Sequence, residues 1–369
     1  MTETVKKNLA EVDVDVDVDV DVDVVIVGGG VAGLSGALTL ARSRRSVLVV
    51  DSGEPRNAPA SGVHGFLSRD GVAPRELLRA GREEVTGYGG RIVPDRAVAA
   101  RRDGERFIVD TAGGRSYTAR RLLVTTGLVD VLPDIPGLRE RWGRDVLHCP
   151  YCHGWEVRDE PIGVLAGGPR AVHQALLFRQ LSPEVTFFLH TADDPGEEQW
   201  EQLAARGIAV VDGEVVALEI SDDRLSGVRL ASGQRVPVRA LAVGPRFEAR
   251  SEVLAGLGLT AVEHPWGVGS YVESDASGFT GAAGVWVAGN VTDLMGGVPV
   301  SAASGVQAAA AINADLVAAD TDAAVARRKA TRLADTFSPA AESANCERIL
   351  GYRAHGLDTL FPLGRPSGQ

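Results

Sequence analysis

Val24-Val25-Ile26-Val27-Gly28-Gly29-Gly30-Val31-Ala32-Gly33 is the stretch of sequence that decides the fold. Its first four residues form a short apolar run, which is typical of a parallel strand buried on both faces. A glycine-rich turn follows at once, and then a helical stretch from Leu34 to Arg45. Residues 46–50 form a second apolar strand that leads into Asp51. The order strand, glycine turn, helix, strand predicts a βαβ unit at the start of a parallel sheet.

The spaced glycines Gly28, Gly30 and Gly33 match the Gly-x-Gly-x-x-Gly pattern of dinucleotide-binding turns. Glycine lets the backbone approach a pyrophosphate closely, and the N-terminus of the following helix offers free N–H groups and a positive dipole end. Asp51 stands at about the expected distance to accept hydrogen bonds from the hydroxyls of an adenosine ribose. The glycines alone would also fit an incidental turn, but the full context favours a bound dinucleotide.

The composition is that of a globular protein with more than one hydrophobic core. The chain has 369 residues, of which 44% are hydrophobic and 24% charged, enough for two domains. Its formal net charge of −11 argues against nucleic acid and anionic membrane surfaces as partners. The sequence shows no transmembrane run and no apolar signal-peptide segment, so we expect a cytoplasmic protein. We expect no metal site.

The candidate redox motif is His148-Cys149-Pro150-Tyr151-Cys152-His153-Gly154-Trp155, which holds two of the three cysteines. A Cys-x-x-Cys pair can close a readily reduced disulfide, and the flanking His148 and His153 titrate near neutral pH. Attachment of a c-type haem, a zinc site and a structural disulfide are the alternatives. Haem attachment needs export, zinc needs further ligands, and so few cysteines do not make a disulfide scaffold. The motif therefore predicts a redox dithiol.

A second βαβ opening follows the cysteines, with strand, turn and helix over 161–180 and the next strand at 185–189. Its turn is degraded, because Ala166 stands where the first glycine belongs and Pro169 lies inside the turn. Residues 190–194, His-Thr-Ala-Asp-Asp, bring no arginine that would hold a 2′-phosphate. We expect Rossmann topology here, while the degraded turn argues against a working NADPH site and equally against NADH.

Both ends of the chain have the composition of tails. An Asp-Val repeat runs up to Val24 and would put a row of like charges on one face of a strand, so we expect residues 1–23 to be disordered. After Ala318 the sequence turns polar and loses its periodicity. We therefore expect 319–369 to be a C-terminal tail, in which Cys346 is an incidental free thiol.

Taken in chain order, these elements resemble the low-molecular-weight thioredoxin-reductase family of flavoproteins. The resemblance covers about 24–318 and also rests on Thr125-Thr126-Gly127 and Ala288-Gly289-Asn290, each at the end of an apolar strand. The family implies an α/β fold with two Rossmann-like, three-layer domains on parallel sheets, the second inserted in the first. The implied boundaries are 24–128 plus 247–318 for an FAD-binding domain and 129–246 for an NAD(P)-type domain that carries the cysteines.

The resemblance also implies FAD as the cofactor and a homodimer. Asn290 stands where the family usually has the aspartate that holds the ribityl chain, and an amide can make the same hydrogen bond. A helix that begins near Val298 would point its N-terminus at the flavin pyrimidine and stabilise the reduced anion. The residues expected to bind FAD are Gly28, Gly30, Gly33, Asp51, Asn57, Gly127, Gly289, Asn290 and Val298.

Within the family, Cys-Pro-Tyr-Cys-His-Gly-Trp is most similar to the dithiol oxidases that close disulfides in small natural products of the holomycin and gliotoxin type. The resemblance implies that a substrate dithiol attacks Cys149, that Cys152 lies against the flavin, and that oxygen takes up the electrons as hydrogen peroxide. His153, or else His148, would act as general base, and Asp293 would orient that imidazole.

Two other functions stay open from the sequence. A reductase would carry electrons from NADPH, NADH or another donor to a thioredoxin-like protein. A flavin-bearing redox sensor would use the dithiol as a switch without turnover. The oxidase would take a small-molecule dithiol and oxygen instead, and no motif specifies the shape of that dithiol.

Overall fold

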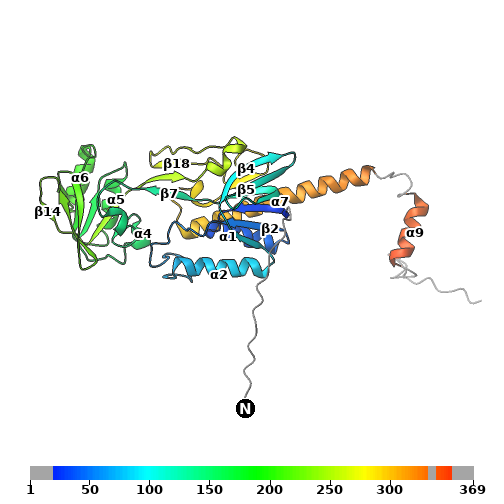
Figure 1. Ribbon diagram of the computed structural model, residues 1–369, viewed down its shortest axis with the longest axis horizontal. Helices are drawn as coiled ribbons and strands as arrows, with labels where there is room; N and C mark the ends of the chain where they lie inside the picture. The colour runs from blue at the N-terminus through cyan, green and yellow to red at the C-terminus, as the bar shows by residue number, and fades with distance from the viewer. Residues whose placement is uncertain (1–19, 331–337, 351–369) are drawn as a thin grey trace, which may run out of the picture. The chain divides into compact units, whose positions relative to one another are not determined.

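The computed structural model describes residues 20–330 and 338–350. The chain divides into one unit of residues 1–313, which contains all the predicted site residues, and a second unit of residues 314–369. The predicted α/β class is confirmed, with helices and two main sheets (Figure 1), and the central strands of both sheets run parallel. Among the described helices, none is long and apolar enough to cross a membrane.

The first sheet contains seven strands: β1 (Val20–Val27), β2 (Val47–Asp51), β3 (Arg91–Pro94), β4 (Ala97–Asp103), β5 (Arg106–Thr111), β6 (Ser116–Val124) and β19 (Val285–Val287). Their order is β3-β2-β1-β6-β5-β4, with β19 paired to β6. β1, β2, β3, β6 and β19 pair in parallel, whereas β4 and β5 form an antiparallel excursion. Because β1 is central, the glycine turn that follows it lies in the middle of the sheet's carboxyl edge.

Three helices accompany this sheet: α1 (Val31–Arg42), α2 (Pro74–Gly87) and α7 (Val298–Ala330). α1 begins directly after Gly30, three residues earlier than the sequence pattern predicts. A Cβ on Gly305 would lie 2.0 Å from the carbonyl oxygen of Ala32, so only glycine permits this approach of α7 to α1. The contact brings the starts of both helices to the same edge of the sheet.

The prediction of a disordered tail up to residue 23 is wrong for its last residues, because β1 begins at Val20. Like-charge repulsion was the reason to expect disorder, and the structure relieves it with arginines. Asp21 pairs with Arg106, and Asp23 pairs with Arg120. Val22 and Val24, on the other face of the strand, are buried in the core. The rest of the predicted tail lies outside the described residues.

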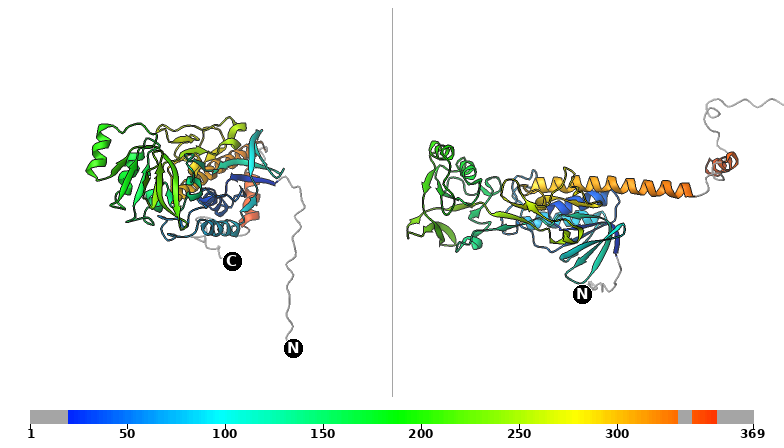
Figure 2. Two further views of the ribbon diagram at one scale, coloured as in Figure 1. Left: turned by 60° about the vertical axis from the view of Figure 1, so that its left-hand side comes forward. Right: turned by 90° about the horizontal axis from the view of Figure 1, so that it is seen from above.

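The prediction of a C-terminal tail is also wrong in part. α7 continues to Ala330 as one helix, drawn in orange in Figure 2, and a further helix, α9 (Pro339–Leu350), follows. Alanine has the highest helix propensity, so an alanine-rich segment forms a helix without an apolar stripe that would reveal it. Cys346 lies exposed on α9. The remaining residues of the predicted tail lie outside the described part of the chain.

The second sheet is parallel throughout and is built from β8 (Val146–Leu147), β9 (Ile162–Leu165), β10 (Val185–Phe188), β11 (Ala209–Val211) and β15 (Ala240–Val243). Its order is β11-β10-β9-β15-β8. α5 (Ala171–Phe178) and α6 (Glu197–Ala205) contribute to the core on one face. The other face packs on an antiparallel sheet of β12 (Val215–Ser221), β13 (Arg224–Leu230) and β14 (Arg235–Val236).

Two strands carry the chain between the sheets. β7 (Leu128–Val131) leaves the first sheet, β16 (Arg246–Ala249) returns from the second, and the two pair antiparallel. They share a small sheet with β17 (Val262–Glu263) and β18 (Gly269–Tyr271). The second sheet is thus inserted between β7 and β16, as predicted. The boundaries 24–128, 129–246 and 247–318 stay a proposal.

Candidate active site

One large cavity, of about 1570 Å³, collects most of the predicted site residues. It is lined by both glycine-rich turns, by the cysteine motif and by the start of α7. Gly33 and Asp293 are absent from its lining. The predicted residues that do line it are Gly28, Gly30, Asp51, Asn57, Gly127, His148, Cys149, Cys152, His153, Gly289, Asn290 and Val298.

The first turn requires glycine for steric reasons at two positions. Gly28 has a φ of +103°, and a Cβ there would lie 2.6 Å from the carbonyl oxygen of Thr125. A Cβ on Gly33 would lie 2.0 Å from the carbonyl oxygen of Gly28. Gly30 caps α1 without any side-chain hydrogen bond, so the first N–H groups of the helix stay available. The turn therefore has the form of a phosphate cradle at a helix N-terminus.

Asp51 lies at the predicted place beside this cradle. Its Oδ1 accepts a hydrogen bond of 3.0 Å from the backbone N–H of Gly29, and its Oδ2 pairs with Arg82 from α2. The carboxylate is therefore held in one orientation at the wall of the cavity. Sequence reasoning missed Arg82, which is one of several arginines on α2 and which no motif distinguishes.

The Thr125-Thr126-Gly127 turn connects the end of β6 to the first glycine turn and to the segment that follows β16. The Thr125 hydroxyl lies 2.8 Å from the carbonyl oxygen of Gly28, and the Thr126 hydroxyl donates to the carbonyl oxygen of Arg250 at 2.6 Å. Gly127 has a φ of +71°, a conformation that favours glycine. The turn thus fixes the glycine cradle against the segment that returns from the inserted domain.

Asn290 uses its amide group differently from an aspartate. Its Nδ2 donates to the carbonyl oxygens of Asp293, at 2.8 Å, and of Gly296, at 2.7 Å. Its Oδ1 accepts a hydrogen bond from Arg56 at 3.4 Å. A carboxylate has no proton to donate to these two carbonyls, so the amide shapes the turn that leads into α7.

Asp293 lies in this same turn, where its Oδ1 accepts a hydrogen bond of 3.1 Å from the backbone N–H of Met295. The predicted contact between Asp293 and an imidazole is not among the hydrogen bonds of the described residues. The carboxylate therefore has a local role in holding the turn before α7.

Cys149 and Cys152 form a disulfide, with Cα atoms 5.3 Å apart. Cys149 caps the short helix α4 (Pro150–His153), and its carbonyl oxygen accepts from the N–H groups of Cys152 and His153, each at 3.2 Å. Pro150 occupies the first helical position, where its missing N–H costs nothing. Local backbone geometry therefore brings both sulfurs to the wall of the cavity.

The cysteine motif contains two large aromatic side chains that are open to solvent. Tyr151 is 78% exposed and Trp155 is 64% exposed. The guanidinium of Arg158 lies over the Trp155 ring at 4.2 Å from its centroid, which holds the indole in place. Each ring combines apolar contact area with one polar group, so both are suited to contacts with an apolar ligand or partner.

The two histidines of the motif have different surroundings. His148 Nδ1 lies 3.1 Å from the carbonyl oxygen of Val243, which can only accept, so Nδ1 carries the proton and Nε2 is the free base. His153 Nε2 is buried and has no hydrogen-bond partner among the described residues. Burial is the main cause that lowers the pKa of both imidazoles, so both are neutral at pH 7.

The second turn lines the same cavity but lacks the steric features of the first. Cβ atoms on Gly167 and Gly168 would meet no atom within 4 Å, and neither glycine has a positive φ. Arg170 turns its guanidinium onto the ring of Trp266, 5.2 Å from the centroid. Gln174, on the helix that follows, donates to the carbonyl oxygen of His148 at 2.6 Å. The turn is therefore built into the wall around the cysteine motif.

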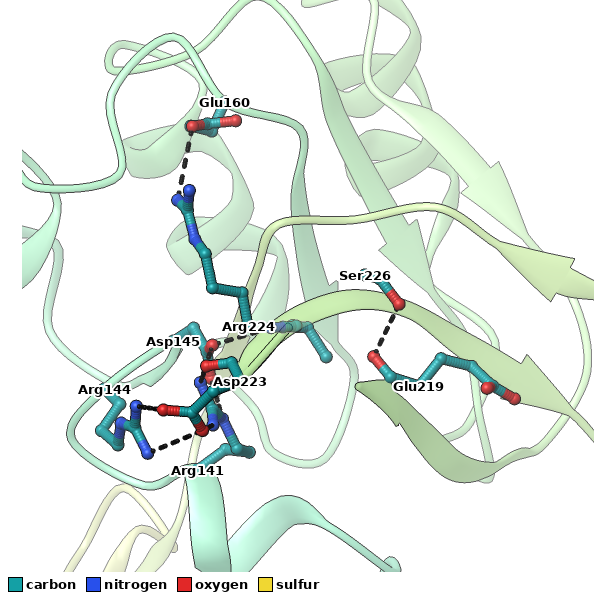
Figure 3. Close-up of polar contacts among 9 residues, drawn as sticks. Arg141, Arg144, Asp145, Glu160, Glu219, Asp223, Arg224 and Ser226 are labelled. Carbon is teal, nitrogen blue, oxygen red and sulfur yellow. Dashed lines mark hydrogen bonds and ion pairs between the residues drawn. The ribbon is translucent and has the colours of Figure 1, made fainter. Parts of the chain in front are cut away.

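A cluster of ion pairs fastens the strand that precedes the cysteine motif (Figure 3). Arg141, at the end of α3 (Leu138–Arg141), pairs with Asp145 and, at 2.7 Å, with Asp223 in the β12–β13 turn. Asp145 also accepts from the backbone N–H of Leu225 at 2.8 Å. The Asp145 carboxylate is the main cause that raises the pKa of Arg141 above its ordinary value.

Sequence reasoning also missed Arg56, although it lies next to the predicted Asn57. Its guanidinium forms two hydrogen bonds to Asp130 on β7, at 2.8 and 2.6 Å, and lies over the Phe247 ring of β16. The one feature of the sequence that could have identified Arg56 is its place next to Asn57, a predicted cofactor-binding residue. Its partners are distant in sequence, so no local pattern identifies them.

The sequence profile of the pyridine nucleotide-disulphide oxidoreductases matches residues 22–310, most of the chain. The chain belongs to this family. It is an oxidoreductase of thioredoxin-reductase type, and the predicted resemblance is confirmed. FAD is the family's cofactor, and the cavity fits it, since it offers the glycine cradle, the Asp51 carboxylate and the N-terminus of α7. The described residues include no cluster of three or more His, Cys, Asp or Glu side chains that could hold a metal ion.

Similar proteins agree on the thioredoxin-reductase type. The crystal structure of HlmI is 46% identical, with a TM-score of 0.80, over 84% of this chain and 97% of that one. Thioredoxin reductase sirT of Leptosphaeria maculans is 29% identical over 80% of this chain and 94% of that protein. Thioredoxin reductase tcpT of Claviceps purpurea is 38% identical, but the match spans 44% of this chain and only 54% of that relative.

Proposed function

We propose that the protein oxidises a small-molecule dithiol to a disulfide through Cys149 and Cys152, with oxygen as the final electron acceptor and hydrogen peroxide as the product. The observation that carries the proposal is that this disulfide lines the same cavity as the glycine cradle for FAD. FAD, when bound there, supplies the two-electron acceptor that returns the cysteines to the disulfide and reduces oxygen.

The sulfur chemistry needs one base and no other reactant. One substrate thiol loses its proton and attacks Sγ of Cys149, so that the Cys149–Cys152 bond breaks and Cys152 leaves as a thiolate. The second substrate thiol then attacks the mixed disulfide, which closes the substrate disulfide and releases Cys149. The neutral imidazole of His148, with its free Nε2, supports its assignment as the base. His153 is the second candidate.

A small apolar dithiol is the proposed substrate class. The exposed rings of Tyr151, which lines the cavity, and of Trp155, at the end of the cysteine motif, supply apolar contact area. The Cys-Pro-Tyr-Cys-His-Gly-Trp motif, which is most similar to that of the dithiol oxidases, supports this substrate class. We also propose a cytoplasmic homodimer on the basis of that resemblance, and the mass of the purified protein in solution tests the dimer.

The second candidate function is a thioredoxin-type disulfide reductase, which the names of the relatives favour. It needs NADPH, NADH or another donor to reduce the flavin. In the second turn Ala166 replaces the first glycine, and Asp193 and Asp194 stand where a 2′-phosphate would need cations. These residues support the oxidase over the reductase.

An anaerobic titration of the flavin absorbance with NADPH and then with a dithiol, on one sample, tests the direction of electron flow. We expect no bleaching with NADPH and full bleaching with a dithiol such as dithiothreitol, followed by oxygen uptake and peroxide formation on admitting air. Bleaching by NADPH would establish the reductase instead. A fully flavin-loaded sample that consumes no oxygen with any of several dithiols would contradict the oxidase.

Replacement of the cysteines tests the route of the electrons. Cys149→Ser and Cys152→Ser are each expected to abolish dithiol turnover and to leave flavin content unchanged, because neither sulfur belongs to the cradle. Cys346→Ser is the matched control, because this third cysteine is exposed on α9, and it should keep full activity. Turnover by the Cys152→Ser protein would show that the proposed relay is wrong.

A further inference from the structure

Four segments that are far apart in sequence meet at the guanidinium of Arg56. Its Nε and Nη2 form two parallel hydrogen bonds to the carboxylate of Asp130, at 2.8 and 2.6 Å. Its Nη1 lies 3.4 Å from Oδ1 of Asn290. Its Cζ lies 5.3 Å from the centroid of the Phe247 ring. Each of its three nitrogens thus donates one hydrogen bond and its flat face lies against a ring, an arrangement that the point charge of a lysine would not reproduce.

Each partner of Arg56 belongs to a different part of the fold. Asp130 and Phe247 are paired residues on β7 and β16, the two strands that lead into and out of the inserted domain. Asn290 shapes the turn before α7, on the side of the FAD cradle. Arg56 therefore joins the flavin-binding half to both connecting strands at one point.

The cluster continues from Phe247 to the cysteine motif. The His148 ring packs edge-on against Phe247, with centroids 5.2 Å apart and an interplanar angle of 84°. Its Nδ1 is hydrogen-bonded to Val243, and its backbone carbonyl accepts from Gln174. The imidazole is thus held by Phe247 and Val243, its backbone is held by Gln174, and Cys149 is the next residue along the chain. By holding Phe247, Arg56 therefore also helps to hold the imidazole of His148, the proposed base.

We propose that Arg56, held by Asp130, is a positioning residue that sets the place of His148 and Cys149 relative to the flavin-binding half of the cavity. The proposal rests on the proposed function, in which His148 is the base for the dithiol. Arg56 acts through Phe247, Asn290 and Asp130 and does not itself react.

The charges around His148 supply a signature of this arrangement. Burial is the largest influence and lowers the pKa of His148, while its hydrogen bond to Val243 raises it. Of the charged groups that face the ring, Arg56 and Arg170 lower the pKa and Asp130 raises it. The two members of the Arg56–Asp130 pair therefore act on the imidazole in opposite directions. General damage to the fold would not produce opposite shifts.

The first experiment is a histidine-ring NMR titration of the purified flavoprotein, with the His148 signal assigned by its loss in His148→Gln. Arg56→Gln removes the cation and is expected to raise the pKa of His148, whereas Asp130→Asn removes the anion and is expected to lower it. The double variant should return the pKa toward that of the parent. Arg229→Gln, which breaks an ion pair with Glu219 on the three-stranded sheet, is the matched control and should cause no shift.

Shifts in the same direction, or no shift in either variant, would overturn the proposal. This readout needs no turnover, so it stands even if the protein proves to be a reductase. A failure of the proposed function would appear only in the oxygen and NADPH measurements.

The second experiment separates positioning from charge with Arg56→Lys. Lysine keeps the cation but cannot form both hydrogen bonds to Asp130 while it stacks on Phe247. We expect the anaerobic rate of flavin reduction by a dithiol to fall about 10- to 100-fold, the scale typical of a misplaced catalytic group. Flavin content and the titre of reducible cysteines should stay at the parent level. A parent-like reduction rate in this variant would show that the geometry of Arg56 is dispensable.

Discussion

The two βαβ openings of this chain share a topology and differ in what their turns can hold. Both place a glycine-rich turn between a buried parallel strand and a helix, and both turns line one cavity. In the first turn a Cβ on Gly28 would meet a backbone atom at 2.6 Å. The second turn has Ala166 at that position, and its backbone does not adopt a positive φ there. The Rossmann topology therefore specifies the sheet, while single residues in the turn decide nucleotide binding.

The two βαβ openings also differ at the ends of their second strands, β2 and β10. β2 ends in Asp51, whose carboxylate is fixed at the wall of the cavity by Gly29 and Arg82. β10 is followed by His190, whose Nδ1 accepts a hydrogen bond of 3.1 Å from the backbone N–H of Val215. Asp51 lines the cavity, whereas His190 does not line it and its imidazole holds the backbone of Val215. The inserted domain thus has the Rossmann scaffold, but its corresponding strand end is engaged in an internal contact.

Gly33→Ala is the sharpest test of this contrast. The added methyl would lie 2.0 Å from the carbonyl oxygen of Gly28, so the turn and α1 must separate and the phosphate cradle is lost. We expect the variant to purify without flavin, as measured by the ratio of absorbance at the flavin band to that of the protein. Ala171→Gly, at the equivalent position of the second turn, is the matched control and should keep its flavin. A yellow Gly33→Ala protein would contradict the steric account of the first turn.

Arg141→Gln tests whether the ion pairs of Arg141 with Asp145 and Asp223 stabilise the inserted domain. The side chains of Arg141 and Asp145 are 7% and 14% exposed, so the variant leaves a largely buried carboxylate without its cation. Removing one partner of a buried pair costs about 3–5 kcal/mol, and we expect a loss of about 3 kcal/mol in the free energy of unfolding, measured in urea. Arg144→Gln removes an exposed arginine from the same cluster and should cost under about 1 kcal/mol. Equal losses in the two variants would show that burial of Arg141 does not matter.

The sequence was most informative where a pattern of residues is compatible with few structures or chemical roles. The glycine turn, Asp51 and the Cys-x-x-Cys pair predicted the fold class and the cavity, because each pattern has a specific steric or chemical reason. The strand at Val20 and the length of α7 were missed, because arginines distant in sequence neutralise the Asp-Val repeat and because alanine needs no periodic pattern to form a helix. Arg56 was missed because its role depends on partners that only the tertiary fold brings together.

The smallest expected effect concerns His190 and the pH dependence of stability. Burial lowers the pKa of His190 in the folded protein below its ordinary value near 6.5. The unfolded chain then binds a proton at a higher pH than the folded one, so this stabilisation is present above about pH 6.5 and is lost as the pH falls through the folded pKa. The same conclusion follows from the hydrogen bond, because protonation of Nδ1 would place a second proton opposite the N–H of Val215.

His190→Gln separates this contribution from those of the other buried histidines. The glutamine oxygen can accept from the N–H of Val215 and does not titrate, so the variant is expected to lose less stability than the parent between pH 7.5 and pH 5.5. His173→Gln, at an exposed position on α5, is the control and should follow the parent curve. The midpoints of urea unfolding at the two pH values measure the difference. If the urea midpoints of parent and His190→Gln fall equally between the two pH values, protonation of His190 does not affect stability. The contrast between His190 and Asp51 would then rest on geometry alone.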